Sequence, residues 1–308
     1  MITADLHNHT TASDGDLTPQ ELVAQAKKAG INVVGITDHD TDAGIQAALS
    51  AGRESGVRVI PGVEISVRFK ESFFTGTLHL LCYFSPESAT NPRFREKLKE
   101  VIKSGRGEKL VRARASEINR FFGPMGKTPL LERDLVYEDI ERYSSNATRR
   151  HFALALNEIH GITDKDRINR IIGNDSPAYL PSGIALEQIK PLTENEPVLL
   201  VLAHPAAGSW PGEGHYREVL PPVETVEKLM PRFLDAGIKG LEVYYPGHTS
   251  SHAELLLSWV KKHDLLVTGG SDCHDLTERP FGISGIGPED WKKFQTALQQ
   301  TGQLYPPQ

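Results

Sequence analysis

The sequence predicts an α/β fold, in which short strands and helices alternate to form a barrel or barrel-like sheet interrupted by a helical insertion. Three observations predict it. Strand and helix patterns alternate near both ends of the 308-residue chain, the middle is charged and helical, and polar residues recur where strands end. Such alternation is typical of a parallel sheet covered by helices, and this length accommodates one large domain with an insertion.

The first elements are predicted by local signals. A strand ends in Asp5-Leu6-His7-Asn8-His9. A helix follows over residues 19–29, because Thr18 to Glu21 form a capping box with proline at the first helical position and Gly30 is a natural stop. The elements after it are a β-branched strand, a helix and another apolar strand, over residues 31–37, 43–55 and 57–60.

The same pattern returns late in the chain. The strands expected there cover residues 78–84, 198–203, 240–244 and 265–268. The helices between or after them cover residues 222–236, 249–263 and 288–300. Between the two halves, long charged helical stretches predict a helical insertion at residues 95–190, leaving 1–94 and 191–308 for the barrel. An independent domain is the alternative for the middle, and residues 68–76 are expected to form a long loop.

Composition excludes several classes of protein. Hydrophobic residues make up 39% and charged residues 24% of the chain, and no apolar run is long enough to cross a bilayer. The N-terminus lacks the basic and apolar stretches of a secretory signal, and Cys82 and Cys273 alone form no disulfide framework, so a cytoplasmic location is expected. A net charge of -6 gives no general attraction for duplex DNA.

Histidine and acidic residues occur regularly where the predicted strands end. His7 and His9 lie on the same side of an extended segment, so both can reach one cation. Each of these residues alone fits a turn, a surface charge or a core imidazole, but the carboxyl ends of barrel strands converge on one face. The motifs are His7-Asn8-His9, Ser13-Asp14-Gly15, Thr37-Asp38-His39, Gly62-Val63-Glu64, His79, Ala203-His204-Pro205 and Gly270-Ser271-Asp272-Cys273-His274. Together they predict a metal cluster.

In this order the motifs resemble the polymerase and histidinol phosphatase (PHP) superfamily of metal-dependent phosphoesterases. The resemblance covers most of the chain outside the insertion. It implies a distorted seven-stranded β/α barrel with three divalent cations, of which Mn is favoured over Fe, Zn or Mg. It also implies a ligand for each ion: His7, His9 and Asp272 for the first, His79 and His204 for the second, Glu64 between these two, and Asp14, His39 and His274 for the third.

Clustered dications favour phosphate ester hydrolysis, because they make hydroxide available near neutral pH and neutralise charge on the phosphoryl oxygens. We assign Glu64, Asp14 and His204 to the catalytic set. Arg149 and Arg150 lie at a predicted helix start, which suits a phosphate group, and His248 is a further candidate for substrate contact. His215 is a weaker candidate of the same kind.

Two segments of the insertion, residues 146–152 and 177–181, resemble the insertion of one PHP branch. Members of that branch remove the 3′-phosphate of nucleoside 3′,5′-bisphosphates and in some cases trim short RNA from its 5′ end. A small nucleotide is therefore the expected substrate, with short 5′-phosphorylated RNA as a further candidate. Two alternatives stay open. One is a phosphatase of histidinol phosphate or another small monoester, and the other is a catalytically silent metal-binding or nucleotide-binding module.

Overall fold

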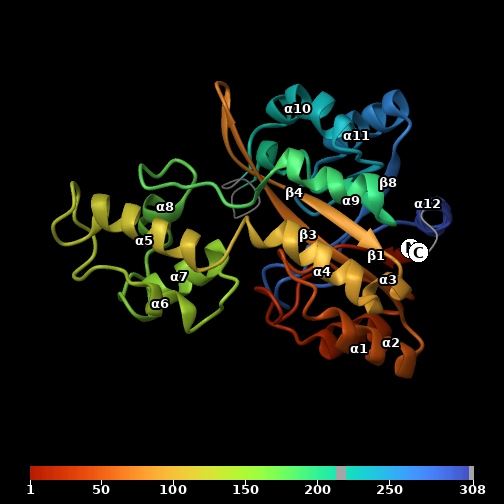
Figure 1. Ribbon diagram of the computed structural model, residues 1–308, viewed down its shortest axis with the longest axis horizontal. Helices are drawn as coiled ribbons and strands as arrows, with labels where there is room; N and C mark the ends of the chain where they lie inside the picture. Colours follow the sequence, from red (N-terminus) through yellow and green to blue (C-terminus); the bar gives the residue numbers. More distant parts are fainter. Residues whose placement is uncertain (213–219, 305–308) are drawn as a thin grey trace.

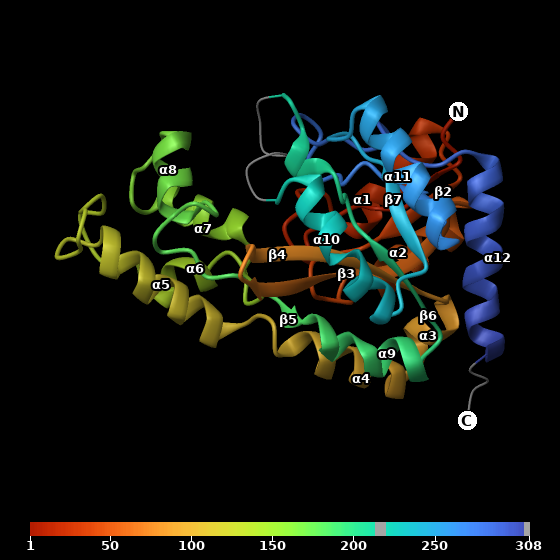
Figure 2. The same ribbon diagram turned by 90° about the horizontal axis from the view of Figure 1, so that it is seen from above.

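A computed structural model describes residues 1–212 and 220–304 of the chain. Its main part is a mixed α/β barrel, and a smaller helical lobe projects from one end (Figures 1 and 2). The strands follow the order β1-β2-β3-β4-β6-β7-β8, and β5 pairs with β3 beside this path. Their bounds are β1 (Ala4–Asp5), β2 (Val33–Ile36), β3 (Arg58–Glu71), β4 (Phe74–Phe84), β5 (Ile184–Ala185), β6 (Val198–Leu202), β7 (Gly240–Tyr244) and β8 (Leu266–Gly269).

Contacts between the first and last strands bring the sheet close to a full barrel. The Leu6 amide donates to the carbonyl of Gly269 at 3.1 Å, and Asn8 and Cys273 form a parallel bridge. The sequence motifs at the two ends of the chain therefore lie side by side. The predicted barrel of seven strands is confirmed.

One strand departs from the expected parallel arrangement. β4 runs antiparallel to both β3 and β6. Residues 68–76 were expected to be a loop, which is wrong, since they form the end of a long β3–β4 hairpin in which Glu71 pairs with Phe74. The alternation of Val67, Arg68, Phe69 and Lys70 explains this, because it buries every second side chain at this end of β3.

Most of the predicted helices are confirmed to within a few residues. Thr18 and Glu21 form the expected capping box, with the Thr18 amide 2.8 Å from the Glu21 carboxylate, and Gly30 ends α1 at φ 70°. The helices around the barrel are α1 (Pro19–Ala29), α2 (Ile45–Ser55), α3 (Pro86–Thr90), α4 (Pro92–Lys103), α9 (Lys190–Asn195), α10 (Val223–Asp235), α11 (Ser250–His263) and α12 (Pro288–Leu304). No helix among residues 1–212 and 220–304 is long and apolar enough to cross a membrane.

The barrel interior is packed, and one of its ends is covered by α12. Phe294 of α12 meets the ring of Tyr83 edge-on at 5.1 Å, and both side chains are fully buried. A larger apolar cluster lies between the sheet and the surrounding helices. In Figure 2, α12 stands at the far side of the barrel from the lobe, so the lobe lies towards the other end.

The helical lobe has an apolar core of its own. It contains α5 (Glu108–Phe122), α6 (Tyr137–Glu141), α7 (Arg149–Glu158) and α8 (Lys165–Ile172). Phe122, Phe152 and Ile171 belong to this separate buried cluster. Helix α4 lies within the predicted insertion, yet Leu98 and other residues on its apolar face pack into the barrel core. We therefore use "helical lobe" for residues 105–182, a shorter segment than the insertion predicted from the sequence.

Candidate metal centre

All of the predicted ligands lie at the end of the barrel where β1, β2, β6 and β8 finish. Asp14 follows in the turn after the first strand, while Glu64 and His79 face the same space from inside the β3–β4 hairpin. His/Asp/Glu ligand atoms within 4.8 Å of one another form three overlapping groups: His9, Asp14, His39 and His274; His7, His9, Glu64 and Asp272; His39, Glu64 and His79. The end of the barrel can therefore hold metal ions in more than one place.

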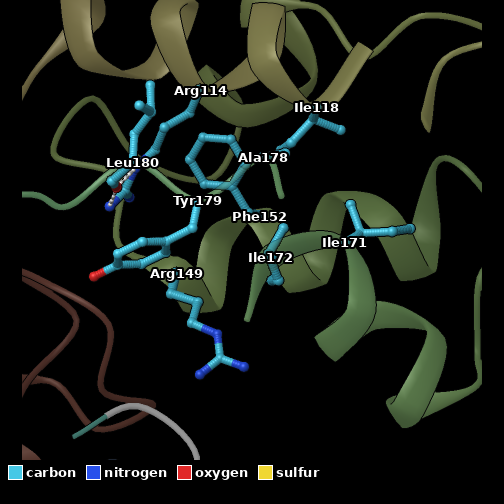
Figure 3. A pocket seen from close by; sticks show the side chains of 9 residues that line it. All are labelled: Arg114, Ile118, Arg149, Phe152, Ile171, Ile172, Ala178, Tyr179 and Leu180. Carbon is cyan, nitrogen blue, oxygen red and sulfur yellow. Dashed lines mark hydrogen bonds between the residues drawn. The ribbon is translucent and has the colours of Figure 1, made fainter. Parts of the chain in front are cut away.

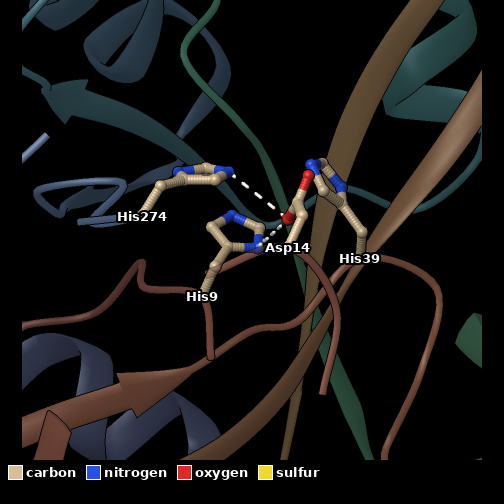
Figure 4. A group of neighbouring side chains, drawn as sticks. All are labelled: His9, Asp14, His39 and His274. Atoms are coloured by element: carbon tan, nitrogen blue, oxygen red, sulfur yellow. Dashed lines mark ion pairs between the residues drawn. The ribbon is translucent and has the colours of Figure 1, made fainter. Parts of the chain in front are cut away.

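The first group surrounds Asp14 (Figure 4). Its Oδ1 atom lies 3.4 Å from His274 Nε2 and 3.7 Å from His9 Nδ1, and the His9 and His39 rings are 4.5 Å apart. The sequence assigned His9 to a different ion from Asp14. The structure places His9 between the two groups, with its other ring nitrogen 3.1 Å from Glu64.

Glu64 lies at the middle of the cluster. Its Oε2 atom is 2.9 Å from His39 Nδ1 and 3.1 Å from His9 Nε2, whereas Oε1 is 3.1 Å from His79 Nδ1 and 3.0 Å from His204 Nε2. The two carboxylate oxygens thus face different sets of imidazoles. This arrangement suits a carboxylate that bridges two ions.

Several buried atoms in the cluster point to cations. Glu64 Oε2, His39 Nδ1 and Asp14 Oδ1 are buried and make no hydrogen bond, although Glu64 Oε2 and His39 Nδ1 are only 2.9 Å apart. Buried polar atoms without partners are costly, and imidazole and carboxylate together are the ligands of first-row divalent ions. The residues present therefore fit divalent metal ions.

The charges in the cluster agree with this. Burial opposes ionisation of Glu64, but the surrounding imidazoles, His39 first, outweigh it and hold the pKa of Glu64 well below its ordinary range. Burial lowers the pKa of His39 to about 4, so this imidazole is neutral and able to donate a lone pair. Asp272 and Glu64 overcome the burial of His9 and raise its pKa to about 10. Protons and cations would therefore compete for His9.

The sequence analysis missed Glu242 in β7, which contacts two of the predicted ligands. Its carboxylate lies 3.0 Å from His7 Nδ1 and accepts a hydrogen bond from the His204 amide at 2.8 Å, and the side chain is fully buried. The contact fixes His7 so that Nε2 faces Glu64 and Asp272. A carboxylate inside the apolar run Gly240–Tyr244 was the available signal.

Two further groups orient ligands and were also missed. Asp38 accepts hydrogen bonds from the Thr10 amide at 2.7 Å and the Ser13 hydroxyl at 2.6 Å, which shapes the turn that carries Asp14. Tyr245 donates to Asp272 Oδ2 at 2.9 Å, so Oδ1 is the oxygen that faces the imidazoles. Asp38 belongs to the Thr37-Asp38-His39 motif and Tyr245 directly follows β7, and neither position in the sequence indicated the direction of the side chain.

The predicted substrate residues occupy different positions. Arg150 lies between the lobe and the barrel, 2.8 Å from Asp16, whereas Arg149 donates to Asn169 at 2.7 Å within the lobe. His248 is less suited to substrate contact, because Nδ1 is 2.9 Å from the Val243 carbonyl and Nε2 accepts from the Ala206 amide at 3.1 Å. Burial lowers its pKa to about 4. His215 lies outside the described residues.

Arg149 also lines a pocket in the lobe, together with Arg114, Phe152 and Tyr179 (Figure 3). The cavity is about 40 Å³. A cavity of about 150 Å³ is known to bind benzene, so this one is too small to enclose a nucleobase. The pocket therefore gives no base-binding site in this conformation.

Comparison with known proteins supports the metal chemistry. A family model described as the PHP domain matches residues 5–158. The chain is 30% identical over 276 residues to a 5′-3′ exoribonuclease of Haemophilus influenzae, covering 88% of this chain and 89% of that protein. It is 26% identical over 282 residues to a phosphoribosyl 1,2-cyclic phosphate 1,2-diphosphodiesterase of Eggerthella lenta, covering 88% and 93%.

A third relative and a solved structure agree. The chain is 27% identical over 276 residues to a 3′,5′-nucleoside bisphosphate phosphatase of Chromobacterium violaceum, covering 89% of this chain and 88% of that protein. A structure from Bifidobacterium adolescentis, assigned as a metal-dependent phosphoesterase, shares the fold with a TM-score of 0.71 and 24% identity over 96% of both chains. Together with the cluster of histidine and carboxylate side chains, these similarities show that the chain belongs to the PHP domain family and is a metal-dependent phosphoric ester hydrolase.

Proposed function

We propose that the protein removes the 3′-phosphate of nucleoside 3′,5′-bisphosphates, releasing a 5′-nucleotide and phosphate. The observation that carries the proposal is the group of arginines on the lobe side of the metal centre. Arg150 pairs with Asp16 and lies 3.8 Å from Asp275. Asp16 lies two residues after Asp14, and Asp275 directly follows His274. A second phosphate of a small substrate would bind the Arg150 guanidinium in place of the carboxylates of Asp16 and Asp275.

Other arginines lie near one another in the lobe. Burial, followed by the nearby Arg106 guanidinium, lowers the pKa of Arg114 to about 10, and Arg149 contributes in the same direction. Guanidinium groups suit bidentate contact with phosphate. One similar protein is named a 3′,5′-nucleoside bisphosphate phosphatase and another a 5′-3′ exoribonuclease, which supports a substrate of nucleotide chemistry.

For the proposal we keep the division of ligands that the resemblance implies, with His9 shared between two sets. Three divalent ions, with Mn favoured, would be held by His7, His9 and Asp272, by His79 and His204, and by Asp14, His39 and His274, with Glu64 between the first two. When bound, such ions supply Lewis acidity and a nucleophile at neutral pH. Glu64, Asp14 and His204 would act by holding these ions beside the reacting phosphate, and the buried position of the cluster limits its access to bulk water.

Short RNA with a 5′-phosphate is the second candidate substrate, because the exoribonuclease relative is similar over most of both chains. A small monoester such as histidinol phosphate requires only the metal centre and no second phosphate site. A silent binding module would retain the ligands without turnover. The cyclic phosphate diester named for the Eggerthella lenta relative adds a diester to the substrates to be compared.

The test measures phosphate release from adenosine 3′,5′-bisphosphate, 3′-AMP and histidinol phosphate, with Mn²⁺ and protein of measured metal content. We expect preference for the bisphosphate, and a larger loss of that activity than of 3′-AMP hydrolysis in Arg150→Ala and Arg149→Ala. Arg112→Ala is the matched control, because Arg112 is exposed on α5 and pairs with Glu108 within the same helix. Equal rates on all substrates would contradict the proposal.

A further inference from the structure

The lobe is joined to the barrel by two segments that touch at Gly105 and Gly183. The Gly183 amide donates to the Gly105 carbonyl at 2.9 Å. A Cβ atom on Gly105 would lie 2.7 Å from the carbonyl carbon of Gly183, and Gly183 itself has φ +100°, so glycine is required at both positions. We call this crossing the neck of the lobe.

Arg106 follows the neck directly and is buried, with 7% of its side chain exposed. Each nitrogen of its guanidinium has a different partner. Nε donates to the Asp40 carboxylate, Nη2 donates to the Ser66 hydroxyl at 2.8 Å, and Nη1 donates to the Ala147 carbonyl at 3.1 Å. Two of these partners belong to the barrel and the third belongs to the lobe.

The barrel partners are adjacent to the metal centre. Asp40 follows His39 and has φ +49°, a strained conformation for a residue with a side chain, and its other oxygen accepts from the Ser66 amide at 2.9 Å. Ser66 lies two residues beyond Glu64 on the same face of β3. Arg106 therefore contacts the residue directly after His39 and the residue two positions after Glu64, both of which are proposed ligands.

The lobe partner precedes the arginines of the proposed phosphate site. Ala147 comes just before Thr148, the residue that begins α7 with Arg149 and Arg150. A second bond joins the same segments, because the Asn146 side chain donates to the His39 carbonyl at 2.6 Å. The start of α7 is thus tied to the end of β2 at two points.

We propose that Arg106 is a positioning residue, which holds the start of α7 at a fixed distance from the metal centre and so sets the reach of the second-phosphate site. Its guanidinium is committed to three protein partners and does not contact substrate. The effect on bisphosphate turnover rests on the proposed function, whereas the effect on the attachment of the lobe does not. Lysine would keep the charge beside Asp40 but lose the planar contacts to Ser66 and Ala147.

The test compares Arg106→Lys and Arg106→Ala with the wild type and with Arg112→Ala, all loaded with Mn²⁺. We expect KM for adenosine 3′,5′-bisphosphate to rise about tenfold or more, the scale of losing one charge-assisted hydrogen bond. Turnover of 4-nitrophenyl phosphate, which carries one phosphate, should change by less than about threefold. Hydrogen exchange of amides at residues 144–152 should become faster, while exchange within α1 stays as in the wild type.

If Arg106→Ala does not fold, Asn146→Ala removes the second tie without leaving a buried charge, and the same exchange in residues 144–152 should rise. A rise in KM with unchanged exchange would overturn the proposal and make Arg106 a direct phosphate ligand. Unchanged KM and unchanged exchange would also overturn it. If the wild type shows no preference for the bisphosphate, the proposed function fails, and the exchange measurement alone still decides the role of Arg106.

Discussion

Glu242 gives the sharpest test of how the metal centre is built. Its buried carboxylate lies 3.0 Å from His7 Nδ1 and accepts a hydrogen bond from the His204 backbone amide at 2.8 Å. His204 has φ +30°, so its backbone depends on such a partner. In Glu242→Gln an NH2 group replaces one carboxylate oxygen. If the amide oxygen keeps the contact with the His204 amide, the N–H bonds of the new group point at His7 Nδ1, and in the reverse orientation they point at the His204 amide.

The expected loss follows from that unpaired donor. A buried donor without a partner, next to a lost charge-assisted bond, costs about 1.5–3 kcal/mol, which is roughly 10-fold to 100-fold in an equilibrium constant. Since His7 and His204 are proposed ligands of different ions, affinity for more than one ion should fall by that factor, in line with known effects of removing partners of metal ligands.

The assay is metal content per chain after equilibration against a series of chelator concentrations, measured by elemental analysis with circular dichroism to verify folding. Glu254→Gln is the control, because Glu254 is an exposed glutamate on the neighbouring helix α11. If folded Glu242→Gln protein kept wild-type affinity for every ion, our account of Glu242 would be refuted.

Three other substitutions test separate residues. Glu64→Gln should reduce phosphate release below detection because it removes the charge between two sets of imidazoles; activity in folded, metal-loaded protein would contradict this. His248→Ala should leave KM unchanged but lower the free energy of unfolding by about 1–3 kcal/mol, since it leaves the buried Ala206 amide unpaired, as urea denaturation can measure. In the lobe, burial raises the pKa of Asp139, but the Arg133 guanidinium and the Val136 amide outweigh it and lower the pKa to about 2. Because the pKa of Asp139 is depressed, its carboxylate stabilises the fold at pH values above about 4, the ordinary pKa of an aspartate. This stabilisation is lost as the pH falls towards 2. Asp139→Asn should therefore cost about 1–2 kcal/mol at pH 7, given the half-exposed Arg133, and the difference from wild type should shrink below pH 4.

The residues of the cluster were predictable because their types and positions carry the signal locally. His7, His39 and Asp272 each follow a short apolar run, and the ends of such runs meet in a barrel. The antiparallel direction of β4 was not predictable in this way, because hydrophobic alternation is the same in either direction. His79 therefore reaches the cluster from inside a strand, at a position that the expected parallel order did not explain.

The supporting contacts were missed for a different reason. Arg106 meets Asp40, Ser66 and Ala147, and none of these pairs is close in sequence. A charged residue in a helical, charged stretch is most simply interpreted as solvated, and only the three-dimensional arrangement shows that this one is buried. Glu242 was detectable as a carboxylate in an apolar strand, but its partners were not.

The junction of the first and last strands has a consequence for biosynthesis. Asp5 accepts two hydrogen bonds from Ser271, a residue 266 positions later, and beside them His9 meets Asp272 at 3.1 Å. Such distant contacts form late, because closing a long loop costs conformational entropy before the contacts that offset this cost have formed. While β8 is still inside the ribosome, Asp272 cannot reach His9. The proposed ligand set is therefore complete only after synthesis has passed His274, and products that end before β8 would lack two of its nine members, Asp272 and His274.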